Sequence, residues 1–356
     1  MKRLGSKIFL IGAAISLALT ASACSLLPGQ KEEAPATPSV SADVKVSENY
    51  YTGIVPYQQN QTRGMFSRLS SSRADFGHQE MGLMEIAQQT FSPSQYFFQE
   101  GQRISRDQVK KWLSSTSENP EGLNPDKGPN LLVHVLEHDY LDMQQKQLAG
   151  IVLGLALSPV YKDASDKEQQ YTIDQLRAKG EQMASRIVQK VRADNPQIPM
   201  VIVLYQVADR NSTLVPGRFI LSGTVNAEES SVSKWQPIDE AYYLFPSAQL
   251  ENDYSQISLQ YDKLMKQLQS FFGEYIGVTG LGRFMSGQLI ELTITATAEY
   301  DSRTEVLQFT QYAAALIDQL FDKNVHVNLY VRTTNQPLAV YVRPADGEPF
   351  MHIYRR

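Results

Sequence analysis

The sequence contains one cysteine, Cys24, among its 356 residues. Because an intramolecular disulfide needs two thiols, the fold must be stabilised by packing alone. The sequence also lacks the GxSxG turn of many serine hydrolases, a phosphate-binding loop and a CxxC pair. These absences exclude dithiol redox chemistry of the CxxC type. They also exclude the nucleotide-binding and serine-hydrolase sites that the other two motifs define.

The sequence also has no excess of basic over acidic residues. The chain carries 33 lysines and arginines against 38 aspartates and glutamates, a formal net charge of −5. Three of the cations, Lys2, Arg3 and Lys7, stand in the first residues, and without them 30 basic residues face 38 acidic ones. Nucleic acid and anionic lipid headgroups attract an acidic protein poorly. We therefore expect no nucleic-acid partner.

The N-terminus has the features of a secretory signal peptide. Its cations precede an apolar run of 16 residues, Ile8–Ala23, which is shorter than the roughly 20 residues that a helix needs to span a bilayer. Small residues at 21–23 stand directly before Cys24, as in a lipobox. We predict that the thiol of Cys24 is alkylated with diacylglycerol, that the chain is cut before Cys24, and that the new amine is acylated, with chains such as palmitate. The anchor would be stable because each buried CH2 contributes about 0.8 kcal/mol.

These features predict four segments. Residues 1–23 form the lipoprotein signal peptide, and 24–49, rich in proline, alanine, serine and charge, form a disordered tether. The rest is longer than one core usually holds, so we predict an N-terminal domain at 50–248 and a C-terminal domain at 249–356. The protein is then expected to be lipid-anchored at the extracytoplasmic face of the cell membrane.

The hydrophobic pattern predicts an α+β fold. One strand, one helix and two further strands follow each other twice, which suggests a duplicated β-α-β-β unit. Thr172 and Gln175 are suited to a capping box at the start of the first of these helices. We expect mainly antiparallel sheets with helices packed on one face. The predicted elements are 148–157, 171–194, 199–207 and 217–225 in the first copy, and 288–300, 304–322, 325–333 and 337–344 in the second.

The stretch HVLEH matches the HxxEH pattern of a zinc peptidase, with His134, Glu137 and His138 as the candidate zinc-binding and catalytic residues. A polar turn separates it from the apolar run 148–157, and two such runs predict a hairpin. In a strand the two histidines would lie about 13 Å apart at roughly 3.3 Å per residue, too far to share one metal. We therefore favour a structural strand, with no catalytic residue, metal or cofactor. A zinc-dependent hydrolase remains the alternative.

Residues 62–102 resemble the CamS family of sex-pheromone precursor lipoproteins from Gram-positive bacteria. The resemblance depends on the Arg63-Gly64 pair, Arg73 and Asp75, the Gly82-Leu83 pair and the segment Gln99–Gln102. It implies that a short apolar peptide is cut from the end of the signal sequence just before the lipidated cysteine. The corresponding segment here is LALTASA, from Leu17 to Ala23. For the folded body the resemblance implies no established reaction.

Charged residues of this motif are candidates for a functional role. Arg63, Arg73, Asp75 and Glu100 would form either a buried ion-pair network or the lining of a binding cleft. The aromatic segments 49–57, 95–101 and 240–245 are likewise compatible with a groove for peptide or glycan, or with ordinary sheet packing.

The sequence as a whole favours a membrane-anchored lipoprotein that is more a binding or scaffolding module than an enzyme. Its expected partners are the membrane, through the N-terminal lipid, and an unknown surface ligand or protein. A solute-binding lipoprotein is the other alternative.

Overall fold

A computed structural model describes residues 39–40, 50–67, 72–213, 216–271 and 276–355. The predicted signal peptide, with Leu17 and Ala23, and the predicted lipidation site Cys24 lie outside the described residues. So does the predicted tether apart from Ser39 and Val40. The chain separates into two compact units, Met1–Ser39 and Val40–Arg356, and both large sheets belong to the second. Within the described part, no helix is long and apolar enough to cross a membrane.

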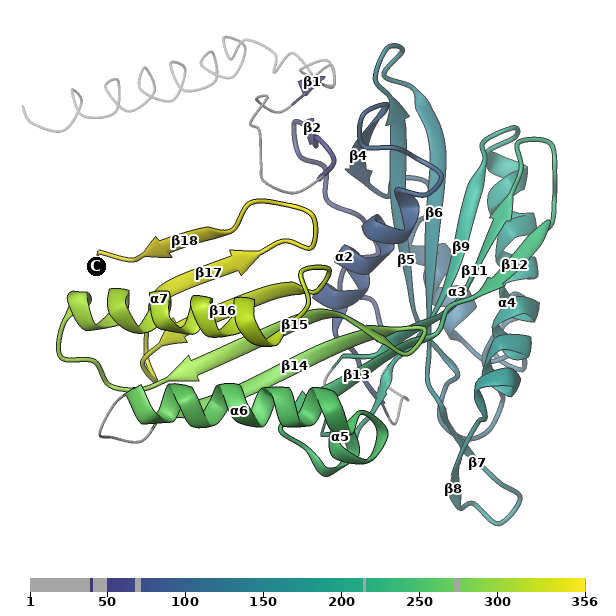
Figure 1. Cartoon of the computed structure of the whole chain (residues 1–356). Helices are drawn as coiled ribbons and strands as arrows, with labels where there is room; N and C mark the ends of the chain where they lie inside the picture. The colour runs from purple at the N-terminus through teal and green to yellow at the C-terminus, as the bar shows by residue number, and fades with distance from the viewer. Residues whose placement is uncertain (1–38, 41–49, 68–71, 214–215, 272–275, 356) are drawn as a thin grey trace, which may run out of the picture. The chain divides into compact units, whose positions relative to one another are not determined.

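The first sheet has six strands in the order β12-β11-β9-β6-β5-β4 (Figure 1). Neighbouring strands are antiparallel except β6 and β9, which run parallel. Parallel neighbours need a long crossover, and helix α4 (Ile173–Asp194) provides it. The strand bounds are β4 Tyr96–Glu100, β5 Leu132–Asp142, β6 Leu148–Leu157, β9 Met200–Gln206, β11 Arg218–Val225 and β12 Lys234–Pro237.

The second sheet has six strands in the order β13-β14-β15-β16-β17-β18. Here only β15 and β16 are parallel among the neighbouring pairs, and helix α7 (Arg303–Leu320) connects them. The strand bounds are β13 Glu240–Phe245, β14 Gly277–Met285, β15 Gln288–Thr297, β16 His326–Arg332, β17 Pro337–Arg343 and β18 Phe350–Ile353.

The two sheets repeat one topology. In each, a strand from the parallel pair is followed by its crossover helix, by its parallel partner and by an antiparallel strand, as β6-α4-β9-β11 and β15-α7-β16-β17. The predicted α+β class and the duplicated β-α-β-β unit are therefore confirmed. The second sheet begins at Glu240, and the division of the chain at residue 248 stays a prediction.

Helices cover the two sheets differently. In the first sheet, α4 packs on one face and α2 (Phe76–Ala87) on the opposite face, so apolar side chains are buried on both sides of its central strands. In the second sheet, α6 (Ser255–Phe271) and α7 pack on one face and enclose a single apolar core. Figure 1 shows α2 at the junction of the two sheets. The opposite face of the second sheet borders this junction.

Local signals explain where several helices begin. Thr172 and Gln175 form the predicted capping box of α4, in which each side chain accepts from the other's backbone N–H. Asp75 caps α2, and Ser302 caps α7. The remaining elements are α3 Arg106–Leu113, α5 Ala248–Asp253, β1 Ser39–Val40, β2 Ile54–Val55, β3 Ser72–Arg73, β7 Val160–Lys162, β8 Glu168–Gln170 and β10 Ala208–Asp209.

Candidate functional site

A groove of about 900 Å³ lies between α2 and the face of the second sheet that α6 and α7 do not cover. We call it the inter-sheet groove. Its volume lies within the range of roughly 300 to 1,000 Å³ that is usual for ligand sites. One wall comes from α2 and the residue before it, and contains Asp75, His78, Met81, Gly82, Met84, Glu85 and Gln88. The sheet wall contains Tyr242, Leu281, Arg283, Ile290, Glu291, Thr293, His326, Asn328 and Tyr330.

The sheet wall is built by strand alternation. Successive side chains of a strand point to opposite faces, so the neighbours of the lining residues, such as Phe284 and Leu292, enter the core under α6 and α7. The register then places lining residues side by side on four strands. Tyr242 pairs with Arg283, Arg283 with Glu291, and Glu291 with His326. This row crosses the sheet at its junction with α2.

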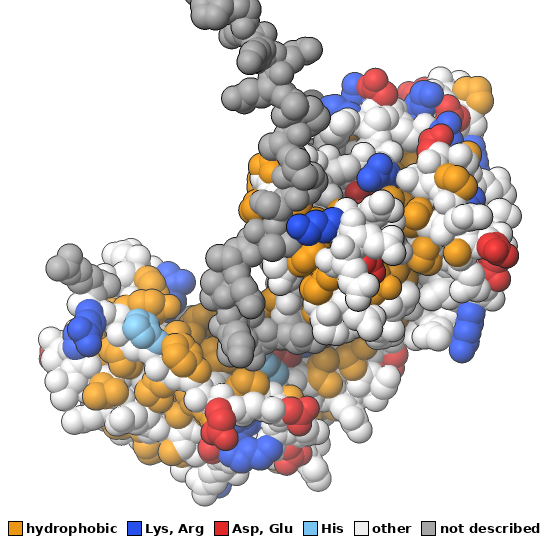
Figure 2. All heavy atoms as spheres, turned by 90° about the horizontal axis from the view of Figure 1, so that it is seen from above, with side chains coloured by type: hydrophobic (Ala, Val, Ile, Leu, Met, Phe, Trp, Pro, Cys, Tyr) orange, Lys and Arg blue, Asp and Glu red, His pale blue; other side chains and the backbone are white. Residues whose placement is uncertain are grey.

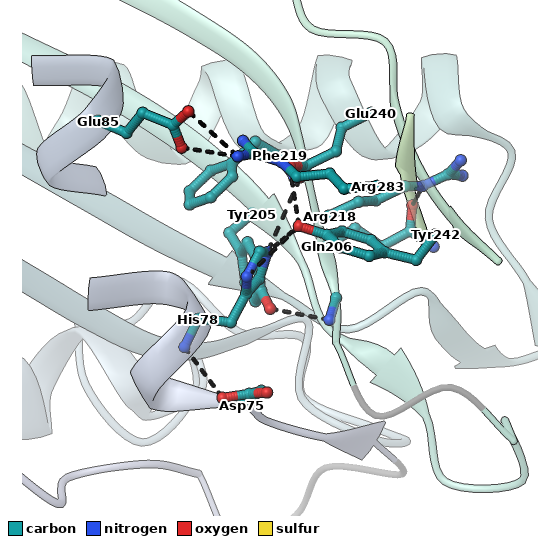
Figure 3. Close-up of polar contacts among 11 residues, drawn as sticks. Asp75, His78, Glu85, Tyr205, Gln206, Arg218, Phe219, Glu240, Tyr242 and Arg283 are labelled. Carbon is teal, nitrogen blue, oxygen red and sulfur yellow. Dashed lines mark hydrogen bonds and ion pairs between the residues drawn. The ribbon is translucent and has the colours of Figure 1, made fainter. Parts of the chain in front are cut away.

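Glu240 connects the two sheets at the base of this row (Figure 3). Its side chain is fully buried. One carboxylate oxygen, Oε1, accepts from Arg283 Nε on β14 at 2.7 Å. The other, Oε2, accepts from the backbone N–H of Phe219 on β11 at 2.7 Å. One buried carboxylate therefore satisfies donors from both sheets.

Arg283 extends the connection to α2. Its Nη1 donates to both carboxylate oxygens of Glu85, at 3.1 and 2.8 Å. The guanidinium thus lies between one buried and one exposed carboxylate, and a charge-assisted pair of this kind also restricts geometry. Helix α2 is held against β14 by this contact (Figure 3).

Tyr242 and His78 complete the cluster. The hydroxyl of Tyr242 donates to Glu240 Oε1 at 3.2 Å and lies 3.0 Å from His78 Nε2. Burial alone would raise the pKa of Glu240, but the hydrogen bond with His78 and the charge of Arg283 bring it below its usual value. Burial, reinforced by the Glu240 carboxylate, raises the pKa of Tyr242. Glu240 is therefore a carboxylate at neutral pH, and Tyr242 remains a protonated donor.

This cluster is suited to holding fixed charges and hydrogen-bond donors beside the groove. Its charged groups are already engaged with one another, which limits their use in proton transfer. The groove adds apolar surface from Met81, Met84 and Leu281. Figure 2 shows acidic, basic and hydrophobic side chains interspersed over the visible surface.

The motif residues singled out in the sequence lie in different places. Arg63 forms an ion pair with Glu100, which also accepts from the backbone N–H of Asn60 at 2.7 Å. Arg73 donates to the backbone oxygen of Ser212 at 3.0 Å. Both arginines are exposed, as expected for long cationic side chains that keep their charged ends in water. The structure thus brings Arg63 and Glu100 together, while Arg73 and Asp75 make other contacts, so the four candidates do not form one buried ion-pair network.

Asp75 is the one member of this set that lines the inter-sheet groove. Its carboxylate accepts from the backbone N–H of His78 at 3.0 Å and caps α2. The same residue thus fixes the start of the helix and contributes an acidic group to the groove. A binding role for the other three residues stays a prediction.

The HVLEH stretch lies on strand β5, as predicted. His134 and His138 share the face that α2 covers, where His134 contacts the backbone oxygen of Met65 and His138 packs edge-on against Phe98. Burial lowers the pKa of His134 to about 4 and that of His138 to about 3. The described residues contain no group of three histidine, cysteine, aspartate or glutamate side chains that could hold a metal ion.

Glu137 lies on the opposite face of β5 from the two histidines, together with Asp139. The Glu137 carboxylate accepts from the backbone N–H groups of Arg103 and Ile104, both at 3.0 Å. Asp139 accepts from that of Gln102 at 3.0 Å. A zinc site that used Glu137 with His134 and His138 would need side chains from both faces of the sheet.

The loop that covers these two carboxylates begins with Gly101 and Gln102 of the motif Gln99–Gln102 and continues through Arg103 and Ile104. At Gly101, a Cβ atom would lie 2.2 Å from Cγ of Glu137, so only glycine allows the loop to approach the strand this closely. The sequence pattern did not indicate that Glu137 and Asp139 form a buried acidic pair, or that Glu240 is buried beside Arg283. A signal existed for the pair, since two acids two residues apart in an apolar strand share a face.

Comparisons with known proteins agree with this architecture. Residues 57–349 match the family described as CamS sex pheromone cAM373 precursor. A crystal structure of a sex pheromone precursor from Lactobacillus salivarius subsp. salivarius UCC118 is 22% identical, with a TM-score of 0.76 over 90% of this chain and 100% of that one. The C-terminal domain of the sex pheromone staph-cAM373 precursor from Staphylococcus aureus is 24% identical, with a TM-score of 0.65 over 79% and 96%. No curated protein matches the chain.

Proposed function

The chain belongs to the CamS sex pheromone precursor family, and from this premise we propose that it is a lipid-anchored binding module at the extracytoplasmic face of the membrane. Two features support the proposal. The cations and apolar run before Cys24 are typical of a lipoprotein signal. The inter-sheet groove supplies a ligand-sized site between walls that Glu240, Arg283 and Glu85 connect. The groove is the observation that carries the binding function.

Cleavage before Cys24 would also free the leader. Its last seven residues, Leu17–Ala23, form a short apolar segment. The solved relatives are described as sex pheromone precursors. By that likeness we propose this segment as the peptide that the leader yields.

Replacing Cys24 with serine should move the protein from the membrane fraction to the medium. The serine hydroxyl is not a substrate for thioether formation, and without acyl chains the attachment loses about 0.8 kcal/mol per buried CH2. Immunoblots of fractionated cells measure the change. Intact-mass analysis of the wild-type protein should show an acylated cysteine at its amino terminus. The control is Ser25→Ala, which keeps the thiol and should stay with the membrane. An unmodified thiol behind an uncut leader would contradict the anchor.

The connected walls make the groove a preorganised site. The Arg283–Glu85 contact holds α2 against β14, and Glu240 bonds both Arg283 on β14 and the backbone of Phe219 on β11. The walls therefore need little ordering when a ligand binds. Rigid sites lose less conformational entropy on binding and gain affinity for that reason.

A photoreactive residue in the groove should capture the natural ligand. We expect p-benzoylphenylalanine at position 281, which lines the groove, to give a cross-linked product after illumination of intact cells. The control is the same residue at position 259, an exposed leucine on α6, on the other side of the second sheet. Mass spectrometry of the adducts is the measurement. Equal cross-linking at both positions, or none at 281, would remove the groove from the proposal. A small adduct mass would identify a solute receptor, and a macromolecular one a binding or scaffolding role.

A further inference from the structure

We propose that the inter-sheet groove binds a basic peptide segment, one that carries lysine or arginine side chains. This inference rests on the proposed binding function and adds the chemical class of the ligand. Among the described lining residues, Arg283 is the single lysine or arginine. Four acidic residues, Asp75, Glu85, Glu291 and Asp346, line the same groove.

The charge of Arg283 is already balanced. Its guanidinium contacts the carboxylates of Glu240 and Glu85, and the three groups together carry one negative charge. Asp75, Glu291 and Asp346 form no ion pair with another residue in the described part of the chain. The lysine, arginine, aspartate and glutamate side chains of the groove therefore carry a clear surplus of negative charge. A concave site of one sign concentrates ligands of the opposite sign.

One of these carboxylates is oriented by its neighbours. Glu291 Oε1 accepts from Asn328 Nδ2 at 3.1 Å, and Asn328 Oδ1 lies 3.1 Å from His326 Nε2. These three side chains stand on the neighbouring strands β15 and β16. The contacts hold the carboxylate in place on the sheet wall. A fixed carboxylate forms a stronger charge-assisted hydrogen bond with an ammonium or guanidinium group than a mobile one does.

Aromatic and apolar residues of the groove lining can contact the cations and the aliphatic stems of lysine and arginine side chains. Tyr330 is 45% exposed and Met81 is 49% exposed. Aromatic faces attract lysine and arginine cations, and apolar side chains accommodate their aliphatic stems. Basic side chains therefore find both an opposite charge and an apolar surface here.

A peptide fits better than a single small amine for two reasons. First, the groove lies near the upper end of the ligand-site range, at about 900 Å³. Second, the corresponding face of the first sheet, which has the same topology, packs against a segment of polypeptide. In the first sheet, the face opposite the crossover helix α4 is covered by a chain segment, α2. In the second sheet, α6 and α7 pack on one face, and the face opposite them forms the groove wall.

Calorimetry with defined peptides tests the inference on the full-length protein. The probes are a blocked octapeptide with lysine at alternate positions, its glutamate counterpart and the neutral sugar chitotriose. We expect saturable binding of the lysine peptide at physiological ionic strength. Thr293→Trp, which fills the groove without changing its charge, should abolish this binding. The double variant Glu291→Gln, Asp346→Asn should weaken it about fivefold, the loss expected from two partly screened charges.

The matched control is Glu299→Gln with Glu348→Gln. It removes the same number of charges at exposed positions outside the groove lining, and it should bind like the wild type. No binding of the lysine peptide, or equal affinity for all variants, would overturn the inference. Binding of chitotriose or of the glutamate peptide alone, lost in Thr293→Trp, would also overturn it but would leave the groove as a binding site. The two failures are thus distinguishable.

Discussion

Replacing Glu240 with alanine should lower the free energy of unfolding by about 3 to 5 kcal/mol, the usual cost of removing one partner from a buried ion pair. The carboxylate is fully buried and bonds Arg283 and the backbone N–H of Phe219. Without it, a largely buried guanidinium loses its closest counter-charge and a buried donor loses its acceptor. Urea denaturation, followed by circular dichroism, measures the loss.

The matched control is Glu85→Ala. Glu85 contacts the same guanidinium, but its side chain is 56% exposed, so water can replace it. Its removal should cost less than about 1 kcal/mol. Equal losses for the two variants would contradict the view that burial at position 240 determines the stability of the junction. A groove that depends on this junction should also bind less tightly in the Glu240 variant than in the Glu85 variant.

Raising the pH from about 6.5 to about 8.5 should lower the free energy of unfolding by about 3 kcal/mol through Glu137 and Asp139. Burial raises the pKa of Glu137 to about 8, with a contribution from the charge of Asp139, and burial raises the pKa of Asp139 to about 7. In this range the folded protein retains protons that the unfolded chain has already released. Stability is therefore highest at lower pH and is lost as the pH rises through the folded pKa values.

The pH range separates this effect from that of the buried histidines. Burial lowers the pKa values of His134 and His138, so their contribution to stability grows as the pH rises toward 6.5 and is complete above it. Denaturant titrations at several pH values above 6.5 therefore report on the acids. Glu137→Gln is neutral at every pH, and its stability should depend less on pH than that of the wild type. An unchanged slope in this variant would refute the assignment.

Several features of the fold could be predicted because they depend on neighbours in the sequence. The apolar spacing within 171–194 and the pair Thr172 and Gln175 act within one helix, and they correctly indicated α4 and its cap. Alternating and continuous apolar runs indicated the strands in the same way. The repeated order of these elements predicted the duplicated β-α-β-β unit. The parallel pair within each unit was not predicted, and in the structure a crossover helix connects its two strands.

The groove depends on residues that the sequence does not bring together. Glu240 is 43 positions from Arg283, and Arg283 is 198 positions from Glu85. No local pattern marks such a set. The histidines of HVLEH show the opposite case, in which residues that are close in sequence are separated from Glu137 by the alternation of a strand. Candidates chosen by spacing alone were therefore placed apart by the fold.

The amino-acid sequence alone indicated the α+β elements and their repeat, and it predicts a lipidated N-terminus. Each of these depends on short-range periodicity or on a contiguous motif. The tertiary structure decided which charges are buried, which acids have raised pKa values and which face of the second sheet forms the groove wall. These properties arise from packing between distant segments, since burial and electrostatic coupling depend on proximity in space.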